Sequence, residues 1–168
     1  MNDMKTLLER FPHAGRIEWL GVRPARNEAV RVVETIEAQP GQGLIGDRYS
    51  GRSGKREVTL IQAEHLPVIQ ALCPGTSIQP EMLRRNIVVS GINLLALKGK
   101  RLRLGEHVIV EITGLCAPCS KMEVVLGSGG YNAMRGHGGV TARVVHSGII
   151  YLGDTASKDD SSEDVPPS

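Results

Sequence analysis

Aromatic residues and cysteines are scarce in this 168-residue sequence, which holds one Trp, one Phe, three Tyr and three Cys. With so few aromatics, the core must consist mainly of Val, Ile and Leu, which favours strands. No apolar run approaches the roughly 20 residues that a membrane helix needs. The composition also excludes a collagen-like chain, a coiled coil and a disulfide scaffold.

An export signal is not visible either. The first residues, MNDMKTLLERFPHAG, lack the apolar segment of a secretory signal. The cysteines, Cys73, Cys116 and Cys119, are odd in number, which fits free thiols in a reducing compartment. These features predict a cytoplasmic protein without disulfides and without a membrane partner.

Charge is spread unevenly along the chain. The formal net charge is +2, but the last fourteen residues hold four carboxylates and one lysine, so residues 1–154 carry +5. A mildly basic domain suits an anionic ligand. A nucleic-acid surface would need clustered Lys and Arg beside stacking aromatics, and the aromatics are nearly absent. We therefore expect no nucleic-acid partner.

Short strands dominate the predicted elements. We expect an N-terminal arm with a short helix over residues 1–14, one domain over 15–154, and a disordered acidic tail over 155–168. The expected strands are Gly15–Val22, Ala29–Ala38, Glu57–Ile61, Asn86–Val89, Arg101–Leu104, His107–Thr113, and a final hairpin of Thr141–His146 and Ile149–Leu152. The expected helical segments are Glu64–Leu72, a single turn at Gln79–Leu83, and Ser120–Leu126.

This pattern predicts a β-rich fold, a closed or strongly bent β-barrel with a few short helices. Alternating strand–helix units are not evident. The sequence contains no G-x-x-x-x-G-K-[ST], and its one G-x-G-x-x-G match, Gly41–Gly46, is not followed by an expected helix, so the usual nucleotide-binding motifs are missing. The segment 127–139 is glycine-rich but lacks the Lys-Ser/Thr of a phosphate loop.

The chemistry centres on Cys116-Ala117-Pro118-Cys119, between a predicted strand and a predicted helix. Cys119 would lie at the first turn, where unpaired N–H groups and Lys121 favour the thiolate form. Three alternatives compete: half of a zinc site, a thioredoxin-like redox pair, and two buried apolar cysteines. A zinc site lacks further ligands at suitable spacing, and the redox pair lacks its α/β setting. Spacing alone does not separate burial from function.

Two further segments suit anion binding. Arg84 and Arg85 precede a strand beginning at Asn86, so their side chains would point to opposite faces, and guanidinium groups bind phosphate or carboxylate. The segment Gly136–Gly139, which includes His137 and Gly138, would bring backbone N–H groups close to an anion. The alternative for the arginine pair is a solvated strand edge. The alternative for the glycine segment is a plain flexible loop.

In order along the chain, these segments resemble the MOSC domain family, named for the C-terminal part of molybdenum cofactor sulfurases. The resemblance spans about Gly15 to Asp154. It rests on Gly46-Asp47-Arg48, Arg56–Ile61, Leu83–Ile92, Thr113–Cys119 and Gly136–Gly139. The resemblance implies a β-barrel domain that binds the molybdenum cofactor or carries sulfur.

The resemblance also implies roles for residues. The family's cysteine after proline corresponds to Cys119, a ligand of the cofactor's molybdenum and the catalytic residue. The implied cofactor-binding residues are Arg84, Arg85, Asn86, Thr113, Lys121, Gly136, His137, Gly138 and Gly139. Cys116 stands where relatives often have other residues, and its role is left open.

Some relatives reduce N-hydroxylated compounds, so the implied function is a molybdenum-cofactor-dependent reductase component, a sulfur carrier, or both. Electrons would come from a separate donor protein, and sulfur from a cysteine desulfurase. The family is associated with pyridoxal phosphate through a sulfurase domain that this sequence does not show. The alternative from another class is a structural or interaction barrel with a buried or zinc-bound cysteine pair.

Overall fold

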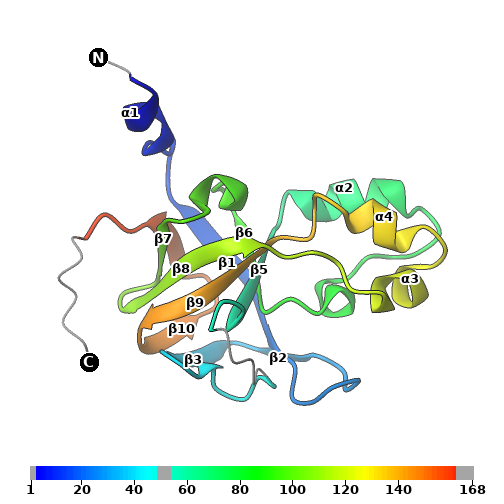
Figure 1. Cartoon of the computed structure of the whole chain (residues 1–168). Helices are drawn as coiled ribbons and strands as arrows, with labels where there is room; N and C mark the ends of the chain where they lie inside the picture. Colours follow the sequence, from blue (N-terminus) through cyan, green and yellow to red (C-terminus); the bar gives the residue numbers. More distant parts are fainter. Residues whose placement is uncertain (1–2, 49–53, 162–168) are drawn as a thin grey trace.

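Short strands form most of the computed structural model (Figure 1), which describes residues 3–48 and 54–161. The strands are β1 (Gly15–Val22), β2 (Arg31–Val33), β3 (Thr35–Gln39), β4 (Gly43–Leu44), β5 (Val58–Gln62), β6 (Ile87–Ser90), β7 (Arg101–Leu104), β8 (Val108–Leu115), β9 (Val140–His146), β10 (Gly148–Tyr151) and β11 (Thr155–Lys158). The helical elements are α1 (Met4–Leu8), α2 (His65–Leu72), α3 (Lys121–Leu126), α4 (Gly130–Met134) and the 3-10 turns η1 (Pro80–Leu83) and η2 (Leu94–Leu97).

In this described part of the chain, seven strands close into a barrel. Their order is β11-β7-β8-β9-β5-β6-β1, and β1 pairs again with β11 to complete the ring. Strand β2 extends the sheet beyond β1, and β10, β3 and β4 form a separate small sheet. The predicted closed β-barrel is confirmed.

One pair of barrel strands is parallel. Strands β5 and β6 run in the same direction, so the chain must cross over between them, and it does so through α2 and η1. The remaining pairs are antiparallel. The crossover ends at Arg84 and Arg85, shortly before β6. The topology therefore places both arginines near the start of a barrel strand.

Two hydrophobic cores result. The first fills the barrel with aliphatic side chains from nearly every strand, such as Ile17, Leu60 and Val110. The second lies between the outer face of β5 and β6 and the three helices α2, α3 and α4, which group on one side of the barrel (Figure 1). Strand β5 is buried on both faces, and its polar residues Thr59 and Gln62 are buried together with Val58, Leu60 and Ile61.

Several predicted elements differ in the structure. The predicted strand Ala29–Ala38 is two strands, β2 and β3, which belong to different sheets. The predicted final hairpin is wrong as well, because β9 pairs with β8 and β5 whereas β10 pairs with β3. The glycine-rich segment 127–139 contains the helix α4. Strand β10 lies far in sequence from its partner β3, so local pattern did not reveal this pairing.

The chain ends also need correction. The arm contains the short helix α1, as expected. The tail does not begin at Thr155, because residues Thr155–Lys158 form β11, with Ala156 fully buried between β7 and β1. Residues 162–168 of the predicted tail lie outside the described residues. No helix in the described ranges is long and apolar enough to cross a membrane.

Strand β11 closes the barrel, so its removal should be costly. Truncation after Asp154 would expose the edges of β1 and β7 and leave a cavity in place of Ala156. We expect it to lower the free energy of unfolding by at least about 2 kcal/mol. Urea unfolding followed by circular dichroism measures the change. Truncation after Ser161 retains the strand and is the control; equal stability of the two truncated proteins would contradict this closure.

Candidate functional site

The arginine segment enters the site through a strained turn. Residue Arg84 ends η1 with left-handed backbone angles, φ 56° and ψ 39°, which non-glycine residues seldom adopt. The reversal directs the next residue, Arg85, into the interior, where it is 5% exposed. The predicted division of the two arginines between different environments is what the structure shows.

The buried guanidinium of Arg85 joins two distant segments. It donates from Nε to the carbonyl oxygen of Gly138 at 2.8 Å, and from Nη2 to that of Ala117 at 3.4 Å. A third bond runs from Nη1 to the Leu83 carbonyl at 3.2 Å. The segment that leads to Cys119 and the glycine loop are therefore held together by one side chain.

Arg85 lacks a carboxylate partner among the described residues. Burial lowers the pKa of Arg85, and the nearby thiols of Cys116 and Cys119 act in the opposite direction. Both cysteines thus lie within electrostatic range of a buried cation. A negative charge on sulfur or on a bound ligand would stabilise that cation.

The two cysteines of the C-x-x-C pair differ in exposure. Cys119 is exposed, whereas Cys116 is 4% exposed and Cys73 is also buried. Cys119 lies immediately before α3, and its carbonyl accepts a hydrogen bond from the Met122 N–H at 3.0 Å. Its predicted position between a strand and a helix is therefore observed. No group of three or more potential metal-ligating side chains gathers in the described residues, so the zinc alternative gains no further ligand there.

Arg84 adds a second cation beside Cys119. Its Nη1 donates to the Glu28 carbonyl at 2.7 Å, but its buried Nη2 has no hydrogen-bond partner in the described part of the chain. Burial lowers the pKa of Arg84, as do Arg23 and Arg48, while Cys119 raises it. We define Arg23, Arg48 and Arg84 as the arginine cluster.

Sequence analysis did not assign Arg23 or Arg48 to the site. Arg23 is held by Asp47 through a two-pronged ion pair, Nη2 to Oδ2 at 2.9 Å and Nε to Oδ1 at 3.2 Å. The signal was present in the Gly46-Asp47-Arg48 segment, which carried part of the family resemblance. Its pairing with Arg23 was hidden because the two segments are far apart in sequence.

Asn86, predicted as a cofactor-binding residue, is buried and bonded within the protein. It has no exposed surface, and its Oδ1 accepts from the backbone N–H of Thr59 at 3.0 Å. Its Nδ2 donates to the Gly21 carbonyl at 3.1 Å and to Asp47 Oδ1 at 3.0 Å. The side chain anchors Asp47, and through it Arg23, so it positions the arginine cluster.

Thr113 is likewise occupied within the protein. Its hydroxyl donates to the Lys55 carbonyl and lies 2.8 Å from the Thr141 hydroxyl. Lys121, at the start of α3, is half-buried and donates from Nζ to Asn27 Oδ1 at 2.6 Å. Thr113 thus supports the barrel wall, whereas Lys121 ties the loop after β1 to the helix that follows Cys119.

The carbonyl groups of the glycine loop bind within the protein. The carbonyl oxygen of Gly138 accepts from Arg85, and that of Gly139 accepts from the Cys116 N–H at 2.9 Å. Side chains would not fit here, because a Cβ at Gly138 would overlap the Cys116 carbonyl and one at Gly139 would overlap the Leu60 carbonyl. Gly136 is exposed, with open space around it. The loop contacts the cysteine segment by close backbone approach.

His137 packs against a second histidine at the start of α2. The rings of His65 and His137 meet edge to face, with centroids 5.4 Å apart. Burial lowers the pKa of His65, His137 lowers it further, and Glu64 opposes both. His137 therefore connects the glycine loop to α2.

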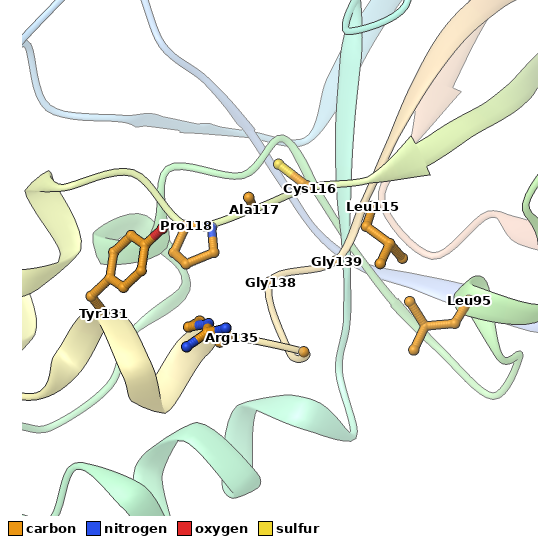
Figure 2. Close-up of a pocket in the computed structure, with 10 residues that line it drawn as sticks. Leu95, Leu115, Cys116, Ala117, Pro118, Tyr131, Arg135, Gly138 and Gly139 are labelled. Carbon is orange, nitrogen blue, oxygen red and sulfur yellow. The ribbon is translucent and has the colours of Figure 1, made fainter.

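A pocket of about 180 Å³ lies beside the cysteine segment (Figure 2). One wall of the pocket consists of the segment Cys116–Pro118 and the glycine loop. The other lining residues are Leu95, Leu115, Tyr131 and Arg135. The Cys116 sulfur points away from the side chains of this pocket in Figure 2. Cys119 is not among the lining residues.

These features define a barrel with an exposed thiol beside clustered guanidinium groups. The sequence matches the MOSC domain over residues 13–157, and the chain belongs to the MOSC domain family. No curated protein matches the chain.

Solved structures share the fold at low sequence identity. The YuaD protein from Bacillus subtilis superposes with a TM-score of 0.74 and 19% identity, covering 86% of this chain and 94% of the other. YiiM from Escherichia coli gives 0.66 and 17%, covering 87% and 70%. YiiM from Geobacillus stearothermophilus gives 0.69 and 17%, covering 87% and 75%.

Gly138 tests the close contact between the glycine loop and the cysteine segment. In Gly138→Ala the new methyl group would overlap the Cys116 carbonyl and lie 3.3 Å from Arg85 Nη2. We expect a loss of about 1–3 kcal/mol in the free energy of unfolding, measured by urea denaturation. Gly75→Ala, with no atom within 4 Å of the new Cβ, should change it by less than about 0.5 kcal/mol. Equal effects of the two substitutions would contradict the contact.

The histidine contact predicts a pH dependence of stability. The folded state lowers the pKa of His65 below its ordinary value of 6.5, so it binds fewer protons than the unfolded chain. This contribution is complete above about pH 6.5 and is lost as pH falls through the lowered pKa. Because the ring is half exposed, the effect should be below about 1 kcal/mol.

Urea unfolding between pH 7.5 and pH 5 measures this effect. The unfolding midpoint of His65→Gln should fall less with acidification than that of the wild type, because glutamine cannot take up the proton. His13→Gln, at an exposed histidine in the arm, is the matched control and should follow the wild type. Parallel pH profiles for His65→Gln and the wild type would exclude this role of His65.

Proposed function

We propose that this MOSC protein binds the molybdenum cofactor, with the Cys119 thiolate as the ligand of the metal. The observation that carries the proposal is an exposed thiol within electrostatic range of Arg84, whose buried Nη2 has no hydrogen-bond partner in the described residues. An anionic group bound beside Cys119 would supply that partner. It would also offset the desolvation of Arg84 and Arg85.

The donor set suits this cofactor. A thiolate is a soft ligand, which is appropriate for a molybdenum-type centre. Guanidinium groups bind phosphate through paired N–H donors, and the arginine cluster places such groups near Cys119. When bound, the cofactor would supply two-electron redox chemistry at the metal.

The residues of this chain would then act in two groups. Cys119 would hold the metal, while Arg84 and Arg48 would bind the anionic part of the cofactor. Arg85 and Asn86 would not need to touch it, because both are buried and bonded to the protein. They would fix the cysteine segment and the arginine cluster in place.

With the cofactor bound, the proposed activity is reduction of an N-hydroxylated compound. Two electrons and two protons convert the N–OH group to N–H and release water. The electrons would come from a separate donor protein. The family membership and the exposed position of Cys119 support this proposal, and the substrate's detailed structure is not part of it.

A second candidate function is sulfur transfer. It is favoured by one observation: Cys119 is exposed and does not line the pocket beside its own segment. A partner protein could therefore reach it directly. The Cys119 thiolate would attack the outer sulfur of a cysteine desulfurase persulfide, forming a persulfide on Cys119 and releasing the desulfurase thiolate.

Metal content separates these functions. Expressed in a host that makes the cofactor, the wild type should carry nearly one molybdenum per chain, and Cys119→Ser should lose it. Elemental analysis and pterin fluorescence measure the loading. Cys116→Ser is the matched control, because it removes the buried thiol of the same pair, and it should retain the metal. Metal-free wild-type protein, or metal retained in Cys119→Ser, would contradict cofactor binding through Cys119.

The same variants test the carrier function. After incubation with a cysteine desulfurase and free cysteine, intact-mass measurement should show one added sulfur on the wild type and none on Cys119→Ser. An unmodified wild type would exclude sulfur transfer. Rapid alkylation of Cys119 near neutral pH would in turn exclude the structural alternative with a buried or zinc-bound cysteine pair.

A further inference from the structure

The pocket in Figure 2 lies where the barrel meets its helical cover. Leu95 comes from η2 and Leu115 from the end of β8, whereas Tyr131 and Arg135 come from α4 and the residue that follows it. The pocket has a volume of about 180 Å³. This is room for a small ligand rather than for a cofactor the size of a dinucleotide.

The walls of this pocket are apolar and exposed. Leu115 is 63% exposed and Tyr131 is 39% exposed, although both are large apolar side chains. In Figure 2 the Tyr131 ring lies next to Pro118 at one end, and Leu95 and Leu115 face each other at the other. Such walls suit a flat apolar group, because covering exposed apolar surface is favourable by about 25 cal/mol per Å².

Arg135 is the single cationic side chain among these lining residues, and the Cys116 sulfur points away. In the described structure its guanidinium bonds only to Asn132 Oδ1, at 3.3 Å, and forms no ion pair with a carboxylate. It therefore keeps donors free for a ligand. Guanidinium groups preferentially take carboxylate or phosphate, and the small apolar pocket favours the carboxylate.

We propose that this pocket binds a small monocarboxylate with a flat apolar body, about the size of one aromatic ring. The ring would lie between Leu95, Leu115 and Tyr131, and the carboxylate would pair with Arg135. The site is separate from Cys119 and the arginine cluster. It does not depend on the proposed cofactor or sulfur chemistry.

Phenylacetate is a suitable probe, with phenylacetamide as its neutral analogue. Titration of the full-length protein, followed by amide chemical shifts in NMR, should give a dissociation constant on the order of 1 mM for phenylacetate. The shifts should map to residues 95, 115–118, 131 and 135–139. Phenylacetamide should bind roughly fivefold more weakly, as expected when a partly exposed charge pair is removed.

Substitutions test the two parts of the site separately. Arg135→Gln should abolish the difference between the two probes, whereas Leu115→Ser should weaken both. Lys98→Gln, which removes a positive charge just after η2 without altering the lining, should change neither. The proposal is overturned if the two probes bind equally to the wild type, or if the shifts map to the arginine cluster.

Discussion

The geometry of the site depends on the hydrogen bonds of the buried Arg85 guanidinium. A cation that is 5% exposed must have its donors satisfied by the protein, and three carbonyl groups from separate segments do so. Removing the side chain would leave buried carbonyls without partners, at about 1–3 kcal/mol for each. The same residue provides positive potential near both cysteines of the pair. Arg85 therefore contributes both to the position of the cysteine segment and to the electrostatic potential at Cys119.

Arg85 reaches this position because of the crossover between the two parallel strands. Strand β6 can pair with β5 only if the chain returns across the barrel, and α2 and η1 cover the outer face of both strands as it does so. The left-handed conformation of Arg84 ends this excursion, at a cost of about 1–2 kcal/mol for a non-glycine residue. Asn86 offsets the cost with bonds to Thr59, Gly21 and Asp47. The strained backbone at Arg84 is thus supported by a buried polar network.

Local pattern was sufficient for much of the fold. Strand Gly15–Val22 has the bounds expected from sequence, and in β7 the alternation of Leu102 and Leu104 with arginines matches burial inside the barrel. Pairing was not predictable in the same way. The segments Thr141–His146 and Ile149–Leu152 look like a hairpin, yet their partners lie more than twenty residues away in the chain. A polar strand such as β11 carries no apolar signal, and closure of the barrel is what orders it.

In the candidate site as well, local properties were predictable from sequence and tertiary contacts were not. The place of Cys119 between a strand and a helix was predictable because it is a local property, whereas its exposure was left open by the sequence. The burial of Asn86 and the use of Gly138 as a close-contact residue depend on what reaches them from elsewhere. The residue types at these positions indicate polarity or flexibility. Whether a polar atom binds a ligand or another part of the protein depends on its tertiary partners.

The cysteine segment finally separates two different binding environments. Cys116 and Pro118 are buried while Ala117 and Cys119 are exposed, as in an extended chain whose side chains alternate. Arg84 of the arginine cluster interacts electrostatically with Cys119, and the apolar pocket is lined by the residues before it. The Ala117 carbonyl, bonded to Arg85, belongs to the wall between them. Arg85 therefore holds the segment that lines the pocket on one side of this wall and lies within electrostatic range of the Cys119 thiol on the other.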